Sequence, residues 1–501
     1  MIRKHPALFL SAAEAFLILL FCTKSSFLYP FNNWTDANCF FTVGKAILNG
    51  QVLYRDIIEQ KGLLLYVLHA LASLVSSGTF TGVFLLEVIC GTFTIYLFHR
   101  ILKSSCGNLS FILAPLAAAL LFTSDVFRHG DSTEELCTPM LLYTAFVTMK
   151  SVEDDTPVSY RQWTVIGILA ACTFWIKYSM CPFFAGAVIL PFVMDIRRKE
   201  AKRIPREILQ ALAGFAAVSV PVLLYFIING ALKDMYDVYF YDNLFRYSAG
   251  ILSGSRAGGP PSAGKPAPGI LLSWFRKAPY HMVLIAIAFL LSALRKKWFR
   301  LLQLLLMFAA SVPALLAGRR YPYYYFILGF LLIFGMEEIG ILILALVRIL
   351  RKDKAKAVRP AFLFAGVILS VFLSTGIACC CSPNRSFRNE KKADLPQFKF
   401  AEIINTVPDA TLLNYGFLDY GFYTAAGIFP SCRFFCSLNG SIPGMSQEMD
   451  SYLKNKEVDF VVTRGQRLKA AGYTQVAAAQ DTYEGIRFTY NLYEKSSLIK
   501  Q

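Results

Sequence analysis

The chain has 501 residues, of which 55% are hydrophobic and 15% aromatic, and its mean hydropathy is +0.48. These values exceed those of a soluble domain of this length and predict a membrane protein. The formal net charge of +17 does not indicate a nucleic-acid partner. Its Lys and Arg residues stand in short clusters between apolar segments, which is how positive charge orients a membrane protein.

Apolar windows long enough for a membrane-spanning helix occur about eleven times along the chain. They cover residues 6–23, 79–99, 109–124, 134–150, 161–176, 178–194, 207–229, 279–294, 299–317, 323–347 and 360–380. The first window follows the basic residues 3–5, and no small-residue cleavage site comes after it. We therefore expect a retained membrane anchor rather than a cleaved signal peptide.

Basic loops predict the orientation of these helices in the cell membrane. The clusters at 197–203, 295–297 and 348–359 fall on one side of the membrane, and the positive-inside rule makes that side the cytoplasm. The N-terminus is then cytoplasmic and the C-terminal tail is outside. The loops that also face outside are residues 24–78, 125–133, 230–278 and 318–322.

The segment Gly62–Ser77 is apolar but short for a span. Counting it as a twelfth span would place the basic loops outside the cytoplasm. We therefore predict a helix that lies in the membrane interface.

The sequence changes character after residue 381. Residues 382–501 lack a membrane-length apolar run, and they contain strand-like stretches and helical patterns in alternation. The stretches that indicate strands are 410–415, 458–462 and 486–490, and 446–455 has a helical pattern. Alternation of this kind predicts a small α/β domain. We expect a membrane module of residues 1–381, with outer loops 24–78 and 230–278, and an extracytoplasmic domain of residues 382–501.

Four features of the predicted outer face carry ionisable side chains. They are Asp36, Glu59 with Lys61, Glu134, and the pair Arg319 and Arg320. A carboxylate can take the proton of a hydroxyl group, and ammonium or guanidinium groups can stabilise a departing phosphate. Considered singly, several have a simpler explanation: Asp36 and Glu134 as helix caps, and the cations as contacts of anionic lipid headgroups.

The predicted outer loop 230–278 has two parts. The first part is aromatic and polar, with Tyr236, Tyr239 and Tyr241, as are surfaces that bind an acceptor or a sugar. The stretch Gly254–Gly269 is rich in Gly, Pro and Ser, which predicts either a mobile lid over a site or an ordinary disordered loop. In the outer domain, Cys432 and Cys436 are close in sequence and could form a disulfide bond. Two free thiols are the alternative, and the sequence leaves both open.

The first outer loop also contains a run of spaced residues. The run is Asp36, Phe40, Gly44-Lys45, Ile47-Leu48, Gly50, Tyr54-Arg55-Asp56 and Lys61-Gly62-x-Leu64-Leu65-Tyr66. It resembles the first outer loop of the GT-C membrane glycosyltransferases, and within them the group of protein O-mannosyltransferases and lipid A aminoarabinose transferases. Thr133-Glu134-Glu135 and Arg320-Tyr321-x-Tyr323-Tyr324 are similar to other recurring patches of that group.

The resemblance covers roughly residues 10–345, and it implies a GT-C-like bundle. In such enzymes the first-loop aspartate is the catalytic base, a role that falls on Asp36. The Lys of a Lys-Gly-Pro-like motif neighbours the lipid phosphate, a role that falls on Lys61. Leu63 stands where Pro is usual. Pro322 stands where a His commonly precedes the tyrosines, and this difference puts dependence on a metal in doubt.

We therefore expect a polytopic α-helical membrane protein that acts as a glycosyltransferase. It would transfer a sugar from a polyprenyl-phosphate-linked donor to a cell-envelope glycan, lipid or protein in one inverting displacement. Asp36 would be the base, and Lys61, Arg319 and Arg320 would hold the phosphate. Glu59 and Glu134 would orient groups or bind a divalent metal, and no other cofactor is expected.

Three other functions stay open at this point. They are a transporter or flippase for a lipid-linked glycan, a polysaccharide polymerase or ligase, and a non-catalytic assembly protein. A transporter predicts charged residues along a path through the spans. Mid-span charges are few here, namely Glu14, Glu87, Glu337 and Glu338, which argues against a transporter.

Overall fold

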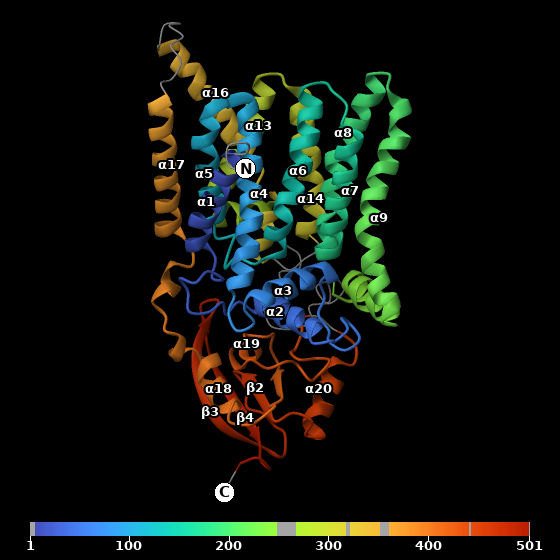
Figure 1. Cartoon of the computed structure of the whole chain (residues 1–501), viewed down its shortest axis with the longest axis vertical. Helices are drawn as coiled ribbons and strands as arrows, with labels where there is room; N and C mark the ends of the chain where they lie inside the picture. The colour runs from blue at the N-terminus through green and yellow to red at the C-terminus, as the bar shows by residue number, and fades with distance from the viewer. Residues whose placement is uncertain (1–5, 248–266, 317–320, 351–359, 440–441, 500–501) are drawn as a thin grey trace. The chain divides into compact units, whose positions relative to one another are not determined.

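A computed structural model describes residues 6–247, 267–316, 321–350, 360–439 and 442–499 (Figure 1). Its contacts divide the chain into two compact units. Unit 1 comprises residues 1–28, 84–221 and 264–386, and unit 2 comprises residues 29–83, 222–263 and 387–501. Most of the predicted outer domain thus clusters with segments of the two longest predicted outer loops.

Unit 1 is built from helices. They are α1 (Pro6–Cys22), α4 (Thr81–Cys106), α5 (Ser110–Phe122), α6 (Thr133–Glu153), α7 (Tyr160–Lys177), α8 (Pro182–Arg197), α9 (Ile204–Ile228), α12 (Ala267–Lys277), α13 (Pro279–Leu294), α14 (Trp298–Leu316), α15 (Phe326–Gly329), α16 (Leu332–Leu350) and α17 (Pro360–Cys381). The ends of α4 and α9 extend into unit 2. A helix occupies each apolar window that was predicted as a span.

Five helical stretches within the described ranges are long and apolar enough to cross a membrane: 81–122, 160–180, 201–228, 298–315 and 361–381. Pro322–Gly329 and Leu332–Leu350, bent by 46°, qualify together as a sixth. The apolar helices α1 and α13 are shorter. These helices make the protein a multi-pass membrane protein, and eleven spans stays a prediction.

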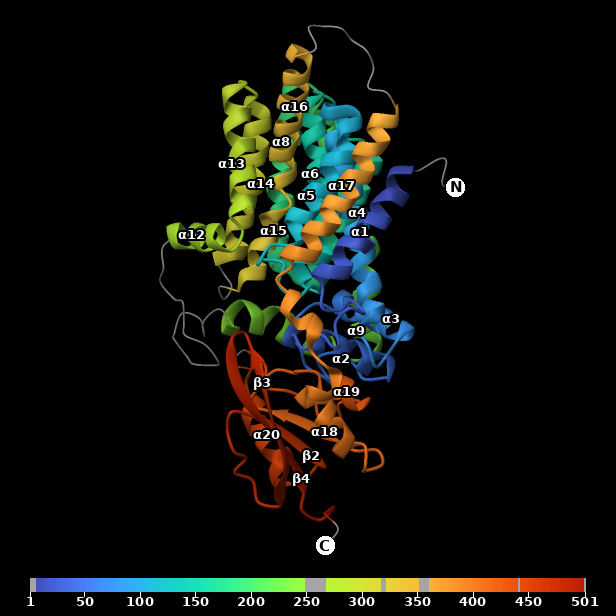
Figure 2. The same ribbon diagram turned by 90° about the vertical axis from the view of Figure 1, so that its left-hand side faces the viewer.

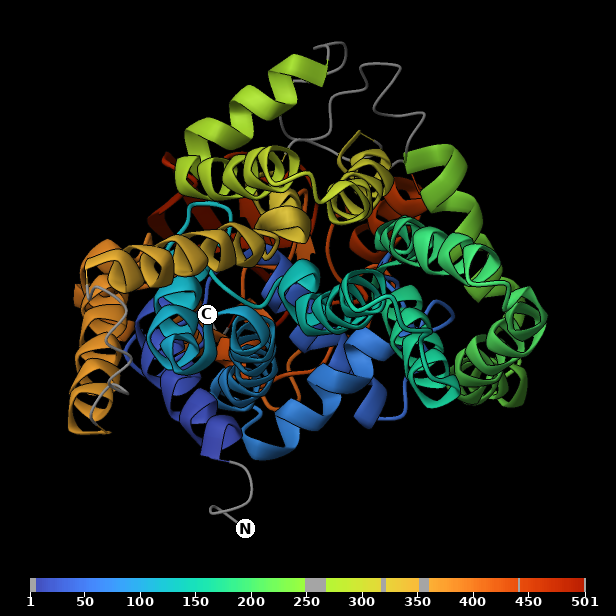
Figure 3. The same cartoon turned by 90° about the horizontal axis from the view of Figure 1, so that it is seen from above.

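The helices of unit 1 pack side by side, and most run along the line of sight in Figure 3. α14 packs against α8 and α6, α13 against α16, and α17 against α5 and α1. Small residues allow close approach at two of these contacts, as in many membrane proteins. A Cβ atom at Gly186 of α8 would lie 2.4 Å from the Leu306 carbonyl oxygen, and one at Gly335 of α16 would lie 1.9 Å from that of Leu284. α12 lies across α13 (Figure 2).

Charged residues inside the bundle pair with one another. Arg300 of α14 lies 2.7 Å from Glu337 of α16 and also contacts Glu153 of α6. Arg295 lies 2.5 Å from Glu338. Each carboxylate has a fixed guanidinium partner, as buried charges require. The acids at 337 and 338 therefore belong to a structural ion-pair cluster.

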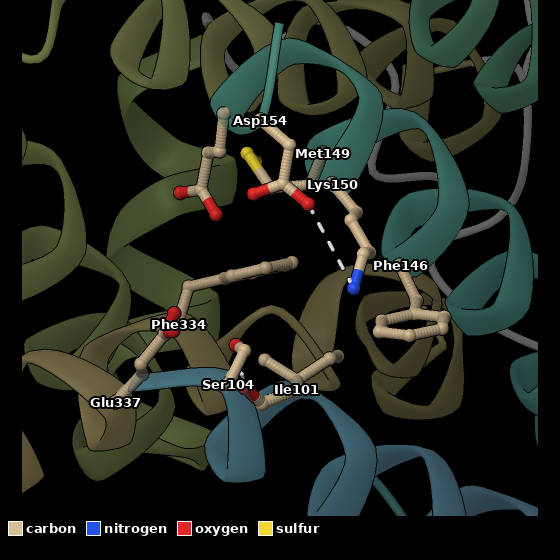
Figure 4. Close-up of a pocket in the computed structure, with 9 residues that line it drawn as sticks. Ile101, Ser104, Phe146, Met149, Lys150, Asp154, Phe334 and Glu337 are labelled. Carbon is tan, nitrogen blue, oxygen red and sulfur yellow. Dashed lines mark hydrogen bonds and ion pairs between the residues drawn. The ribbon is translucent and has the colours of Figure 1, made fainter. Parts of the chain in front are cut away.

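A cavity of about 40 Å³ lies beside this cluster, and its lining includes Glu153, Glu337 and Phe334 (Figure 4). Its other charged residues form an ion pair, in which Lys150 lies 3.7 Å from Asp154. A space of this size holds at most a few water molecules. It is too small for a lipid-linked sugar.

Unit 2 combines helices with a four-stranded sheet. Its helices are α2 (Thr35–Leu48), α3 (Leu63–Val75), α10 (Leu232–Met235), the π-helix η5 (Tyr236–Tyr247), α18 (Pro396–Ile404), α19 (Phe422–Ala426) and α20 (Met445–Lys454). Its strands are β1 (Leu412–Tyr415), β2 (Phe460–Arg464), β3 (Tyr473–Tyr483) and β4 (Ile486–Lys495). The order is β1-β2-β4-β3, with β1 parallel to β2 and the other pairs antiparallel. The predicted α/β character is confirmed.

Glycine at position 44 lets α2 cross closely over α3. A Cβ atom at Gly44 would lie 2.7 Å from the Ala70 backbone nitrogen and 2.8 Å from the His69 Cβ. The helix predicted within Gly62–Ser77 is confirmed as α3. It exposes Leu71 and Leu74, which suits the predicted place in a membrane interface.

The described residues leave parts of two predicted features undefined. Arg319 and Arg320 lie outside them, as does most of Gly254–Gly269, whose last three residues begin α12.

Candidate active site

Asp36 lies in the first turn of α2 and is half-buried. The N-cap position belongs to Trp34, whose backbone is extended and whose side chain makes no capping hydrogen bond. Asp36 is therefore not the capping residue, contrary to the simplest alternative from the sequence. Its carboxylate stands two positions inside the helix, where the exposed amides of the first turn favour negative charge.

The motif residues Asp36 and Phe40 lie one turn apart on the same face of α2, because residues four apart are neighbours on a helix. The Lys61 ammonium lies 5.9 Å from the centroid of the Phe40 ring. That ring also contacts Tyr66 and His69 of α3. A carboxylate and an ammonium group thus border one face of α2.

Lys61 is held by Glu59. The Glu59 Oε2 atom accepts a 2.9 Å hydrogen bond from the Lys61 backbone amide and another from the Tyr66 hydroxyl. Its Oε1 atom lies 3.9 Å from the Lys61 Nζ atom. The Glu59 side chain is 7% exposed, whereas that of Lys61 is 24% exposed. The acid is enclosed and the cation keeps an accessible side, so a second anion can reach it.

Tyr54 supports the segment that carries Lys61. Its hydroxyl donates to the Lys61 carbonyl oxygen, and its ring stacks on Phe226 at 5.5 Å and on Tyr239 at 6.4 Å. The predicted aromatic loop is thus brought to the Lys61 segment, and Asn243 also donates to the Gln60 carbonyl oxygen at 2.8 Å.

The three tyrosines predicted for an acceptor or sugar surface differ in exposure. Tyr239 is 1% exposed, whereas Tyr236 is 56% and Tyr241 is 40% exposed. Tyr239 therefore supports the Lys61 segment, and the other two rings offer surface to a ligand.

The C-terminal segment of unit 2 holds the middle of α2 through Asp419. The Thr42 hydroxyl donates a 2.8 Å hydrogen bond to Asp419 Oδ2, and Asn414 and the Gly421 amide each donate to Oδ1 at 2.9 Å. Burial raises the pKa of Asp419. One buried carboxyl group thus fixes α2 to the loop after β1.

Lys45 forms a second buried connection from α2. Its ammonium donates to the Thr424 hydroxyl at 3.1 Å and to the Ser77 carbonyl oxygen at 3.4 Å. Burial lowers the pKa of Lys45 to about 8, and the nearby Asp419 acts in the opposite direction. Charge at this position is therefore costly to the folded protein.

The residues that flank Asp36 are held in the same way. Asn33 donates to the Tyr420 hydroxyl at 2.9 Å, and Tyr420 in turn donates to Asp481 at 2.8 Å. The Thr35 and Tyr483 hydroxyls are 2.8 Å apart. These partners were missed in the sequence, because they are about 390–450 residues away along the chain and no local pattern marks them.

A second charged cluster lies in unit 1 at the start of α6. Glu134 forms an ion pair with Lys177, the last residue of α7. The Lys177 ammonium also lies 4.1 Å from the centroid of the Tyr324 ring and 6.0 Å from that of Tyr323. Two predicted outer patches thus meet at a lysine that was not singled out from the sequence. The sequence feature that could have identified Lys177 is its charge within the apolar run 161–194.

Ser132 is the N-cap of α6. Its hydroxyl accepts a 3.0 Å hydrogen bond from the Glu135 amide. Glu134 is therefore not the cap, and the corresponding alternative from the sequence is wrong. Its carboxylate is instead available to Lys177 and to the Thr133 hydroxyl, which donates to it at 2.8 Å.

Two acids, Glu59 and Glu134, are the proposed metal ligands. Within the described ranges, no group of three or more His, Cys, Asp or Glu side chains is arranged to hold a metal ion. Glu59 is engaged by Lys61, and Glu134 by Lys177. No step of a reaction is therefore assigned to a metal. Cys432 and Cys436 are both free thiols, and the Cys436 sulfur lies 4.0 Å from that of Cys39.

Comparisons with known proteins agree with this architecture. Residues 61–225 match the family model of dolichyl-phosphate-mannose-protein mannosyltransferases, a segment that includes Lys61, Glu134 and Lys177. None of the curated proteins compared with the chain matches it in sequence. The crystal structure of ArnT from Cupriavidus metallidurans in the apo state aligns over 100% of both chains, with 10% identity and a TM-score of 0.55. The chain therefore has the fold of ArnT, and over residues 61–225 it carries the sequence pattern of the dolichyl-phosphate-mannose-protein mannosyltransferase family.

Proposed function

We propose that the protein is a membrane glycosyltransferase that uses a polyprenyl-phosphate-linked sugar. It transfers that sugar, outside the cytoplasm, to a glycan, lipid or protein of the cell envelope. The matching family is named for a donor of this class, dolichyl-phosphate mannose. The observation that carries the proposal is the position of the Lys61 ammonium near the Phe40 ring of α2, one helical turn from Asp36.

In the proposed reaction, Asp36 removes the proton from the acceptor hydroxyl. The oxygen attacks the anomeric carbon of the donor, a new glycosidic bond forms, and the bond between that carbon and the phosphate oxygen breaks. The bonding electrons leave with polyprenyl phosphate. A single displacement inverts the anomeric configuration.

Lys61 stabilises the charge that develops on the leaving phosphate. Glu59 fixes the lysine through its backbone amide and keeps its ammonium oriented. An ammonium group held in place before the reaction costs little reorganisation when charge appears. Tyr54 and Tyr239 support the same segment from the other side.

Lys177 is a further candidate for the phosphate or for the lipid beside it. It is held between the Glu134 carboxylate and the Tyr324 ring, and it belongs to the segment that matches the family model. Arg319 and Arg320 stay proposed phosphate ligands on sequence grounds.

A deletion strain and the purified protein together test the function. Mass spectrometry of the cell-envelope glycans from the deletion strain should show the loss of one sugar substituent. The purified protein should release polyprenyl phosphate from one member of a panel of polyprenyl-phosphate hexoses, pentoses and aminopentoses. A deletion strain that keeps every substituent but accumulates a lipid-linked oligosaccharide would instead identify a transporter or a polymerase.

A further inference from the structure

A large cavity lies in the C-terminal segment of unit 2. Its volume is about 900 Å³. Tyr415 and Thr463, at the carboxyl ends of the parallel strands β1 and β2, form one part of its lining. Ligands of open α/β sheets bind outside the carboxyl ends of parallel strands. Residues from the end of α20 and from the loop 466–471 complete the lining.

The charge of this lining is strongly positive. Among the described residues that line it, Lys454, Lys456, Arg467 and Lys469 contribute four cations, and Asp450 is the single acid. The Asp450 carboxylate already accepts a 2.5 Å hydrogen bond from the Tyr415 hydroxyl. In the part of the chain that the structure describes, none of the four cations has a carboxylate partner within 4 Å. Four uncompensated cations around one cavity favour an anionic ligand.

The loop that carries Arg467 and Lys469 is anchored by hydrogen bonds. The Thr463 hydroxyl donates to the Gln466 carbonyl oxygen at 2.6 Å, and the Leu468 amide donates to the Tyr493 hydroxyl at 3.0 Å. Both bonds reach residues of the sheet, Thr463 in β2 and Tyr493 in β4. Arg467 and Lys469 therefore flank Leu468, whose amide is hydrogen-bonded to the sheet.

Close packing also places Lys456. A Cβ atom at Gly472 would lie 2.5 Å from the Lys456 Cε atom, and Gly472 has a φ of +89°. Lys456 itself follows α20 with a φ of 57°. The turn after α20 and the end of the loop 466–471 thus both position Lys456 at the cavity.

The lining also has an apolar part. Leu453, Leu468, Ala470, Ala471 and the Tyr415 ring contribute to it. The volume is within the range of small-molecule sites, about 300–1,000 Å³, and far exceeds the space that an inorganic phosphate needs. A ligand with flat apolar ring faces, polar edges and negative charge matches such a lining.

We propose that this cavity binds an anionic saccharide. Its phosphate or carboxylate groups meet Lys454, Lys456, Arg467 and Lys469, and its sugar rings pack against Tyr415 and the leucines. The proposal of a binding site depends only on the lining of this cavity. Its role as the acceptor site of the enzyme rests on the proposed glycosyltransferase function.

The test measures binding by the full-length protein in nanodiscs of neutral lipid. The probes are an oligogalacturonate, a phosphorylated oligomannose, a neutral oligomannose of the same length and inorganic phosphate. Isothermal titration should detect the oligogalacturonate, the phosphorylated oligomannose or both, and the stronger of the two identifies the anionic group. The neutral oligomannose and inorganic phosphate should each bind at least about tenfold more weakly.

Charge-reversal variants tie the binding to the cavity. The pair Lys456→Glu and Arg467→Glu should weaken binding by about tenfold or more, because two charge-assisted contacts are lost. Lys391→Glu with Lys399→Glu is the matched control, since these exposed lysines belong to unit 2 and do not line the cavity. Neutral Gln variants of Lys456 and Arg467 replace the Glu pair if that pair lowers the melting temperature.

Several results would overturn the proposal. They are no binding of either anionic saccharide, equal affinity for inorganic phosphate or for the neutral oligomannose, and equal loss in the control pair. Binding of vesicles of anionic lipid, without binding of the saccharides, would instead make the cavity a membrane contact. A failure of the proposed transferase function would leave all of these affinities unchanged, so the two ideas fail separately.

Discussion

The ammonium of Lys61 lies 3.9 Å from the carboxylate of Glu59, which also accepts a 2.9 Å hydrogen bond from the Lys61 backbone amide. One enclosed acid therefore orients both the backbone and the side chain of this lysine. A lysine that merely contacted lipid headgroups would have no need of such a fixed position. The arrangement is what a phosphate ligand of a transferase requires.

Replacing Lys61 separates a phosphate ligand from a membrane anchor. We expect Lys61→Ala to lower donor turnover by roughly 10²–10³-fold, and Lys61→Arg to retain part of the activity, because Arg keeps the charge but changes the geometry. Turnover should be measured at limiting and saturating donor in one lipid mixture. If Lys61→Ala changes neither the apparent donor affinity nor the maximal rate, the phosphate belongs to other cations, Arg319 and Arg320 first.

Replacing Glu134 and Lys177 separates stability from catalysis. Removal of one member of a buried ion pair costs about 3–5 kcal/mol, because the other charge is left uncompensated. Glu134→Gln and Lys177→Met should therefore each lower the melting temperature, and the double variant should recover much of the loss. If Lys177 also contacts the donor, turnover stays low in the double variant. Recovery of stability and turnover together would make the pair purely structural.

Lys45 should give the protein a pH dependence of stability. Its pKa is lowered from 10.5 to about 8 by burial, so between these values the unfolded chain holds a proton that the folded protein has lost. The free energy of unfolding then rises with pH across this window, by at most about 3 kcal/mol. Lys45→Met should be more stable than the wild type at pH 7, and the difference should shrink by pH 10. A difference in melting temperature that does not change with pH would contradict this account.

Gly44 should be intolerant of a side chain. A Cβ atom there would lie within 3.0 Å of backbone and Cβ atoms of His69 and Ala70, so α2 and α3 would have to separate. We expect Gly44→Ala to destabilise the protein by about 1–3 kcal/mol, as overpacking does. Gly78→Ala is the control, because no atom lies within 4 Å of the Cβ position there. Equal melting temperatures for the two variants would show that the helices do not cross so closely.

The helices of the bundle could be predicted from the sequence because apolar periodicity is a local signal. Each predicted window became a helix, from α1 to α17. Strand β3 was missed, because Ala477, Ala478 and Ala479 and its polar neighbours have low strand propensity. The turn Glu484-Gly485 after it has positive φ at both residues, which is the signature of a tight hairpin.

The candidate site could be predicted only in part. Asp36, Glu59 and Lys61 stand within one loop of the sequence, so spacing and charge brought them together. The hydrogen bond from Thr42 to Asp419 joins residues 377 positions apart, and no periodicity or local motif indicates it. Lys177 carried a signal, a lysine inside an apolar run, but its partner Glu134 became evident only from the packing of α7 against α6.

The central claim is that Asp36 is the catalytic base, and Asp36→Asn tests it most directly. The amide keeps the size of the side chain but cannot take a proton, so turnover of the polyprenyl-phosphate sugar should fall by about 10²–10⁴-fold. The melting temperature should change little, because Trp34 holds the N-cap position and a favourable charge in the first turn of a helix is worth only about 0.3–1 kcal/mol. Purified wild type and variant should be compared for polyprenyl phosphate release and thermal unfolding in the same detergent. Lost turnover with an unchanged melting temperature is the predicted result, and near-normal turnover in the variant would contradict the account.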